Sequence, residues 1–394
     1  MELAGTEVPV VWRGRRVTAF VPELLAARDL TLSEKVAARC GAATESVAAG
    51  ASALPEDYAS LARLLLRAEG IASSYIEGVA APVVDVVLAE NVEDAAPSPA
   101  AWVAASLAAT DAAVRSAIGQ DPLAVDDLCR WHAALMSGSP TPARQVGRLR
   151  TEQGWIGGSS PLDAALVTPP ADRLEALLAD LLTFVNQADR DPIATAALAH
   201  AQFELIHPFA DGNGRIGRIL VSWILTRRLR LLTPPPVSVR IAADVGGYSA
   251  GLTLYRFGRT SEWVAWFADA VSGAGRAQRQ LVDDVASIRS DWRATLRAHG
   301  TGRALRADAA AWRVLSLLPR FLVLSAPVVA DALGLTRKGA GDALRTLADA
   351  GVLTPYDGPA PPRLGRPPKL YVSEELLGLA GSSALRQGSI RSPH

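Results

Sequence analysis

The chain has 394 residues, 49% of them hydrophobic, which is too long for one typical domain and supplies enough apolar side chains for a sizeable core. Its formal net charge is zero and it has only two cysteines, Cys40 and Cys129, so no global field steers it toward nucleic acid, and neither a disulfide framework nor a zinc site is indicated. The N-terminus has no charged flank followed by an apolar run, and no apolar stretch reaches about 18 residues, so we expect a cytoplasmic protein without membrane contact.

The first predicted element is a short β-hairpin over Val8–Val21, which turns at Arg13-Gly14. Helical periodicity dominates the chain after this hairpin. An interval rich in Pro and Ala at 95–100 then separates an N-terminal segment, residues 1–98, from a central unit, residues 99–298. Helical patterns in the central unit cover roughly the ranges 101–137, 171–188, 192–206, 214–230 and 259–298. The sequence therefore predicts a mainly α fold.

Two polar side chains lie together on a predicted helix of the N-terminal segment. Ser73 and Glu77 are four residues apart and face the same way on that helix, and Gly78 marks its end. From the residue types alone, Glu77 is one acidic group at a helix terminus, and most such groups are merely solvated. These residues alone therefore assign Glu77 no role.

A β-hairpin is predicted within the central unit. Glycines punctuate residues 147–158, and the run Val167-Thr168-Pro169-Pro170 follows. An exposed strand edge here, at Ile156, Gly157 and Gly158, could hold a target segment in extended form by strand addition. An ordinary surface hairpin is the alternative, and the residues do not decide between the two.

The most informative stretch runs from His207 to Arg218 and reads HPFADGNGRIGR. Residues 211–214 favour a turn, and apolar residues at helical spacing follow, so a helix should begin near Asn213. The turn amides would then lie at a helix N-terminus. Unpaired N–H groups and the positive end of the helix dipole bind anions there, and glycines let a phosphate approach the backbone.

The side chains of this stretch suit a polyphosphate with its metal. Arg215 and Arg218 are three residues apart and share a helix face, where they could grip different phosphates. A divalent cation between Asp211 and phosphate oxygens would explain an anion in this cationic setting. His207 can accept a proton from an incoming hydroxyl near neutral pH. Each residue alone favours an ordinary loop role, whereas their joint order indicates a nucleotide site.

The stretch resembles the signature HPFx(D/E)GNGRxxR of the Fic family, whose members transfer AMP from ATP to a protein hydroxyl, and every signature position is present. The resemblance implies a Fic-type helical core with His207 as general base and Asp211 holding Mg²⁺. It also implies a nucleotide-binding set of Gly212, Asn213, Gly214, Arg215 and Arg218, the last at the γ-phosphate. Some relatives that phosphorylate carry Lys at the position of Gly214, so adenylyl transfer is favoured.

The resemblance extends to segments on either side. Ser73 to Gly78 is similar to the (S/T)xxxE(G/N) inhibitory motif of one Fic class, which implies that Glu77 pairs with Arg218 and blocks productive seating of the γ-phosphate. The hairpin around Ile156, Gly157 and Gly158 resembles the β-hairpin flap that docks targets. Ser238, Tyr248 and Tyr255 fall where relatives have residues near the adenosine.

The last segment, residues 299–394, has the pattern of a winged helix. Ser325 can cap a first short helix and Thr336 a second one. The stretches 352–354 and 370–372 fit the strands of a wing. The predicted tip of this wing carries Arg363, Gly365, Arg366 and Lys369. The boundary at residue 299 further predicts that the central unit stays folded and active without this segment.

Basic residues of this last segment suit DNA. Arg337, Lys338 and Arg345 lie on the second helix, whose N-terminal residues could enter a major groove, while the wing tip could reach a minor groove. Winged helices also serve as protein-docking or dimer modules, and the basic cluster here is small. DNA and a second copy of the chain are therefore alternative partners.

Two hypotheses of different kinds follow. The first is a protein adenylyltransferase that moves AMP from ATP to a Ser, Thr or Tyr hydroxyl, modifies itself and is restrained by Glu77, with removal of AMP as a second activity that some relatives with this glutamate have. The second is a DNA-binding regulator whose Fic core only senses nucleotide. A sensor needs the phosphate grip but no base, so the intact His207 favours the enzyme. The target protein is not named by the sequence.

Overall fold

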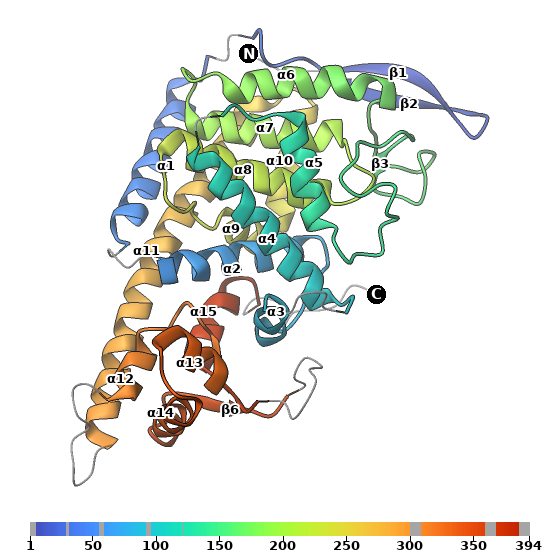
Figure 1. The fold of residues 1–394 in the computed structure, drawn as a ribbon. Helices are drawn as coiled ribbons and strands as arrows, with labels where there is room; N and C mark the ends of the chain where they lie inside the picture. The colour runs from blue at the N-terminus through green and yellow to red at the C-terminus, as the bar shows by residue number, and fades with distance from the viewer. Residues whose placement is uncertain are drawn as a thin grey trace.

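The structure is a computed structural model, and it describes residues 5–28, 31–54, 59–91, 96–119, 121–299, 309–358 and 368–385. Within these ranges the chain is mainly helical, which confirms the predicted fold class, and the strands form small separate sheets (Figure 1). No helix in the described ranges is both long and apolar enough to cross a membrane. The wing-tip residues Arg363, Gly365 and Arg366 lie outside the described residues.

The N-terminal region begins with the predicted hairpin and continues as helices. Its elements are β1 (Gly5–Trp12), β2 (Arg15–Pro22), α1 (Glu34–Ser52), α2 (Ala59–Ile76) and α3 (Val83–Ala89). β1 and β2 pair in antiparallel register, and both turn residues, Arg13 and Gly14, have positive φ values of 46° and 79°. Such a turn matches the twist of a two-residue hairpin, so the prediction over Val8–Val21 is confirmed.

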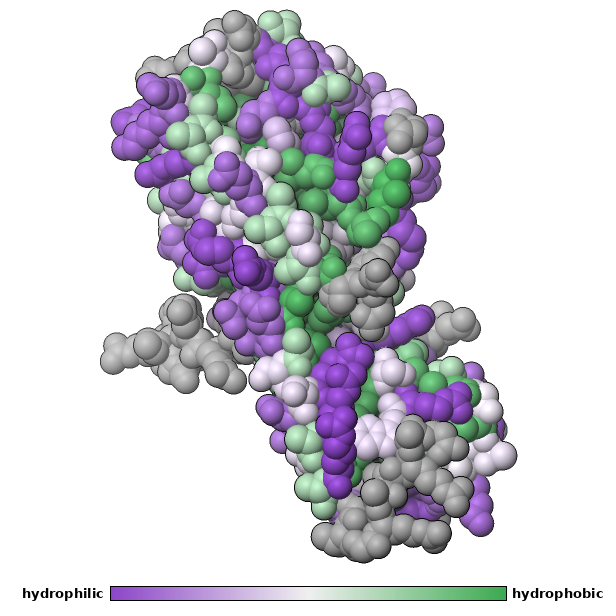
Figure 2. Space-filling view, turned by 90° about the vertical axis from the view of Figure 1, so that its left-hand side faces the viewer, coloured by the Kyte–Doolittle hydropathy of each residue, from purple (hydrophilic) through white to green (hydrophobic). Residues whose placement is uncertain are grey.

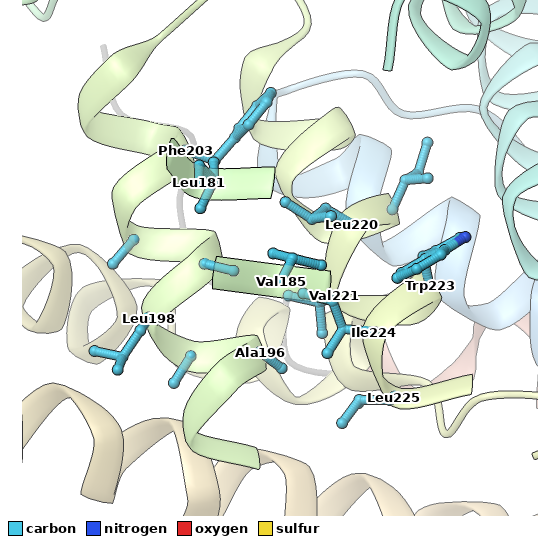
Figure 3. Close-up of a cluster of buried hydrophobic side chains, with 14 of the residues drawn as sticks. Leu181, Val185, Ala196, Leu198, Phe203, Leu220, Val221, Trp223, Ile224 and Leu225 are labelled. Atoms are coloured by element: carbon cyan, nitrogen blue, oxygen red, sulfur yellow. The ribbon is translucent and has the colours of Figure 1, made fainter. Parts of the chain in front are cut away.

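The central unit packs helices around a buried pair. Its elements before residue 230 are α4 (Pro99–Ile118), α5 (Val125–Leu135), β3 (Trp155–Ile156), β4 (Leu166–Val167), a 3-10 turn (Ala171–Arg173), α6 (Leu174–Asn186), α7 (Pro192–Ile206) and α8 (Asn213–Leu229). The prediction of one helix over 101–137 is wrong, because Gly119 and Pro122 interrupt it. α7 is buried at nearly every position, and its side chains interlock with those of α6 and α8 (Figure 3). The turn between α7 and α8 is thereby held on two rigid helices.

Three further helices complete the central unit: α9 (Val237–Ala243), α10 (Val245–Arg256) and α11 (Thr260–His299). The sequence pattern predicted α11 but neither of the two helices before it, since α9 has only 7 residues and α10 contains the Gly246-Gly247 pair. α11 has 40 residues and runs along one side of the molecule from the helical body to the C-terminal module, residues 309–385 (Figure 1).

The C-terminal module combines short helices with a small sheet. Its elements are α12 (Ala310–Leu315), β5 (Val323–Ser325), α13 (Ala326–Leu333), α14 (Arg337–Asp349), β6 (Thr354–Tyr356), β7 (Leu370–Val372) and α15 (Glu374–Leu385). The sheet is antiparallel in the order β5-β7-β6. The two predicted caps are present, since Ser325 and Thr336 accept from the N–H groups of Val328 and Gly339. The first predicted wing strand is present as β6 but begins at Thr354, two residues later than predicted, because the N–H groups of Val352 and Leu353 donate to the Leu347 carbonyl at the end of α14.

The core of the C-terminal module is shared with helices outside it. Side chains from three helices outside it belong to the same buried cluster: Leu61 and Leu64 of α2, Val87 of α3, and Val285, Trp292 and Leu296 of α11. In Figure 2 the larger and smaller lobes meet at a narrow waist. The division at residue 299 therefore does not separate two independently packed units.

We expect the two halves to stay associated when the chain is cut between them. A protease site inserted within residues 300–308, which lie outside the described residues, should yield fragments that co-elute on size-exclusion chromatography. Each large apolar side chain left uncovered by separation would cost roughly 1.5–3 kcal/mol. The uncut insertion variant is the control. Fragments that separate with unchanged thermal stability would contradict the shared core.

Candidate functional site

The stretch from His207 to Arg218 forms the turn between α7 and α8. His207 and Gly212 both lie in the left-handed region, with φ values of 49° and 76°. Asn213 closes the turn with its side chain: the Phe209 N–H donates to Asn213 Oδ1, and Asn213 Nδ2 donates to the Phe209 carbonyl, both at 2.9 Å. α8 begins at Asn213 as predicted. The backbone N–H of Asn213, rather than its side chain, is therefore the group that can face a phosphate.

His207 is arranged as a proton acceptor. Its Nδ1 lies 3.3 Å from the Glu204 carbonyl oxygen, so the proton is assigned to Nδ1 and Nε2 is left as the acceptor. Burial lowers the pKa of His207 to about 4, so the imidazole is neutral at pH 7. A neutral ring in this tautomer can take a proton from a hydroxyl group.

A histidine that the sequence analysis did not single out supports the turn. His132 of α5 stacks on Phe209, with ring centroids 4.1 Å apart and planes 7° from parallel. Its Nδ1 accepts the Gly147 N–H at 2.8 Å, so its Nε2 carries the proton and donates to the Asp211 carbonyl at 3.1 Å. Burial lowers the pKa of His132, which favours this neutral form. A lone histidine within a helix gives no sequence signal for such a task.

Arg150 joins the same turn to the flap. The side chain is buried, and its Nε donates to the His207 carbonyl at 2.8 Å. Its Nη2 donates to the Pro169 carbonyl at 2.6 Å and to the Thr168 hydroxyl at 3.1 Å. These two residues directly follow β4, so one guanidinium fixes the flap relative to His207.

The flap is a minimal hairpin. Ile156 pairs with Leu166 in the antiparallel ladder between β3 and β4. Gly157 and Gly158 follow with φ values of 71° and 70°, which turn the chain away from the strand. Of the three predicted docking residues, Ile156 lies on the strand and the two glycines form the turn beside it.

The N-terminus of α8 presents two buried arginines. Arg215 and Arg218 are 6% and 2% exposed. Among the residues that the structure describes, no hydrogen-bond partner satisfies Arg215 Nε or Arg218 Nη1. Buried nitrogens are costly to leave unpaired, and the first-turn N–H groups of a helix also lack partners within the helix. We give the name anion cradle to Arg215, Arg218 and the first-turn N–H groups of α8, since an anionic ligand would satisfy their unpaired donors.

A carboxylate of the protein lies in the anion cradle. Glu77 follows the last residue of α2, and its Oε1 is 2.8 Å from Arg218 Nη2. A Cβ atom placed on Gly214 would overlap the same Oε1 and would lie 3.2 Å from Arg218 Nη1. Glu77 therefore covers the first turn of α8, and residue 214 must be glycine in this arrangement.

Ser73 contributes two further contacts to Arg218. Arg218 Nε donates to Ser73 Oγ at 2.9 Å, and Nη2 donates to the Ser73 carbonyl at 2.8 Å. That carbonyl is available because the Glu77 N–H donates to the Ser74 carbonyl instead, at the end of α2. Arg218 thus binds the C-terminal end of α2, where the helix dipole favours a cation.

Asp211 lies exposed at the edge of the turn, where its Oδ1 accepts the Gly212 N–H at 2.6 Å. Over the described ranges, no group of three or more His, Cys, Asp or Glu residues could hold a metal ion. Asp211 therefore offers a single carboxylate. One or two carboxylates, with phosphates and water, are the usual ligands of Mg²⁺.

The residues predicted near the adenosine are buried: Ser238, Tyr248 and Tyr255. Their hydroxyl groups pair, in that order, with Glu69, His200 and Gln202. These hydroxyl groups are therefore engaged inside the protein, and the structure does not present them as free ligands for a nucleotide.

A neutral histidine, a glycine-rich turn and unpaired arginine nitrogens thus meet at one helix N-terminus, an arrangement that suits a phosphate group with a base beside it. Residues 122–225 match the Fic/DOC family, and this part of the chain is a Fic/DOC family domain. The matched range includes the flap and the whole turn from His207 to Arg218, whereas Glu77 lies outside it.

Relatives with named activities match part of the chain. Protein adenylyltransferase fic-1 of Caenorhabditis elegans is 34% identical over 110 residues, which cover 27% of this chain and 20% of that protein. Protein adenylyltransferase Fic of Nematostella vectensis is 31% identical over 123 residues, which cover 30% of this chain and 26% of that protein. The chain thus spans only 20% and 26% of the length of these two curated relatives.

Solved structures match over a longer range. A Fic family protein from Desulfovibrio desulfuricans aligns with a TM-score of 0.52 and 23% identity, and covers 87% of this chain and 97% of that one. A Fic domain containing signaling protein from Bacteroides thetaiotaomicron aligns with a TM-score of 0.51 and 17% identity, and covers 61% of this chain and 97% of that one. At these identities the matches show a shared fold.

Proposed function

We propose that the protein transfers AMP from ATP to the hydroxyl group of a Ser, Thr or Tyr side chain. The observation that carries the proposal is the neutral His207 beside the anion cradle. A hydroxyl nucleophile needs such a base, whereas a nucleotide sensor does not. The relatives named protein adenylyltransferase support the same activity.

The residues take complementary parts in this reaction. His207 Nε2 accepts the hydroxyl proton while the oxygen attacks the α-phosphorus, and the bond to the bridging oxygen breaks so that pyrophosphate leaves. Arg215, Arg218 and the first-turn amides of α8 hold the β- and γ-phosphates in line. Asp211 would hold Mg²⁺, and the ion when bound would neutralise phosphate charge.

Glu77 restrains the reaction in this proposal. Its carboxylate occupies Arg218 Nη2 and covers the first turn of α8, so it competes with the γ-phosphate of ATP for the same groups. ATP that binds beside Glu77 is then held with its α-phosphate out of line for attack. The position also suits a second activity, in which Glu77 orients a water molecule that removes AMP from the modified hydroxyl.

The target segment would dock on the flap, and the protein itself is an expected target. Ile156 of β3 pairs with Leu166 of β4, and Arg150 joins the residues after β4 to the turn carrying His207, so an added strand at β3 would bring its hydroxyl toward the base.

Mass spectrometry tests the proposed activity. The purified full chain is incubated with ATP and Mg²⁺, and a mass increase equal to AMP on a Ser, Thr or Tyr residue is the expected result. Incubation with ADP is the control, since it cannot release pyrophosphate. Transfer of a phosphoryl group instead of AMP would overturn the proposal. So would a Glu77→Gly protein that modifies neither itself nor any protein in an added extract.

A second function is proposed for the C-terminal module. Helices α13 and α14 with the β5-β7-β6 sheet have the element order of a winged helix, and Arg337, Lys338 and Arg345 are exposed on α14. These features favour binding of duplex DNA, with a homodimer contact as the alternative. DNA affinity that falls steeply with salt and weakens in Arg337→Ala would support the DNA proposal.

A further inference from the structure

α2 carries one polar stripe toward the catalytic helices. Glu69, Ser73 and Glu77 follow at intervals of four residues and therefore lie along one side of the helix axis. The last two contact Arg218, as described above. Glu69, two turns back from Glu77, contacts a different helix, α9.

The Glu69 carboxylate binds the start of α9 with both oxygens. Oε2 accepts the Ser238 N–H at 2.7 Å, and Oε1 accepts the Ser238 hydroxyl at 2.5 Å. Glu69 is 4% exposed and Ser238 is fully buried. Burial raises the pKa of Glu69 to about 7, although the Ser238 bonds and the nearby Arg218 oppose that rise. A buried carboxyl is costly to the fold unless it is hydrogen-bonded, so the two Ser238 bonds hold Glu69 strongly to the start of α9.

The C-terminal module covers this joint from the other side. α15 packs against both α2 and α9, the two helices that Glu69 connects. Nearer the start of α2, Arg67 donates to the Arg320 carbonyl at 2.9 Å and to Glu90 at 2.8 Å. Along α2, the polar contacts of Arg67, Glu69 and Ser73 thus reach three different segments, and the Glu69–Ser238 contact is the one that joins α2 to α9.

We propose that Glu69 is a positioning residue, which acts through Ser238 to hold α2 in the register that seats Glu77 in the anion cradle. The inference rests on the proposed function, because it concerns restraint of AMP transfer. Glu69 touches neither the cradle nor the turn from His207 to Arg218. Its removal should therefore change how often Glu77 is seated and leave the transfer machinery intact.

The test compares Glu69→Ala, Glu69→Gln and Ser238→Ala in the full chain, each with and without Glu77→Gly. We expect Glu69→Ala to raise the initial rate of self-adenylylation roughly tenfold, a factor typical for loss of a hydrogen bond to a charged group. Glu69→Gln should stay near wild type, because a glutamine oxygen accepts the Ser238 N–H and its amide nitrogen donates to the hydroxyl. Ser238→Ala should lie between the two.

Measurements in the Glu77→Gly background show whether Glu69 acts through Glu77. There Glu69→Ala should add no further rise, since the restraint is already absent. A second measurement, hydrogen exchange over residues 71–78, should show faster exchange in Glu69→Ala and wild-type exchange in Glu69→Gln. If Glu69→Ala lowers the rate in both backgrounds, or leaves exchange over 71–78 unchanged, the positioning role is wrong. A failure of Glu77→Gly itself to modify any protein would instead overturn the proposed function.

Discussion

Replacement of His207 by alanine is expected to abolish AMP transfer while ATP still binds. In the proposed function the phosphates are held by the first turn of α8, Arg215 and Arg218, and the imidazole takes no part in that binding. Loss of a general base typically lowers the rate by about 10² to 10⁴. Initial rates of self-adenylylation and ATP binding by calorimetry, both in the Glu77→Gly background so that transfer is measurable, check the two parts of this prediction.

The pH dependence of the reaction gives an independent check on His207. Because burial holds its pKa at about 4, below the ordinary 6.5, the free enzyme protonates this base only as the pH falls toward 4. The acid limb of kcat/KM should therefore lie well below pH 6. A rate that halves near pH 6.5, or undiminished self-modification in His207→Ala, would show that another group is the base.

Replacement of Glu77 by glycine is expected to raise self-adenylylation sharply. The change removes the carboxylate from the first turn of α8 and from Arg218 Nη2. A hydrogen bond between charged groups contributes about 1.5–3 kcal/mol, which corresponds to a rise of roughly 10- to 150-fold. The two Ser73 contacts to Arg218 remain, so the arginine stays in place for the γ-phosphate.

Two comparisons distinguish the causes of such a rise. Arg218→Ala should not imitate Glu77→Gly, because it removes the phosphate grip together with the restraint. Release of AMP from pre-modified protein should be measured for wild type and Glu77→Gly. If Glu77 also assists removal of AMP, the glycine variant accumulates more modified protein even at an unchanged rate of transfer. Equal rates of transfer and of release in both proteins would end the inhibitory interpretation of Glu77.

Local sequence patterns predicted the elements that are determined by residues close together in the chain. The turn at 207–218, the helices around it and the caps at Ser325 and Thr336 follow from residue types at fixed spacing. The placement of Glu77 near Arg218 was available only through family resemblance, since 141 residues separate the two. No spacing rule relates groups so far apart in the chain.

Other features depend on packing that no local pattern encodes. His132, Arg150 and Glu69 work through backbone groups of distant segments, so their residue types alone carry no signal. Asn213 was predicted to bind the nucleotide, and no local pattern indicated that its side chain would close the turn through Phe209. The boundary at residue 299 followed the winged-helix pattern of the last segment, and the hydrophobic cluster crosses that boundary.

The position of α2 between two lobes makes nucleotide seating and the C-terminal module energetically interdependent. Its 18 residues form a rod of about 27 Å, with Leu61 and Leu64 in one lobe's core and Glu77 just beyond the other end. A ligand that displaces Glu77 by shifting α2, rather than by turning the Glu77 side chain alone, works against contacts made by that rod in the smaller lobe. Thermodynamic linkage is reciprocal. A molecule that binds the smaller lobe and loosens α2 would therefore raise the affinity for ATP by the same factor by which ATP raises the affinity for that molecule.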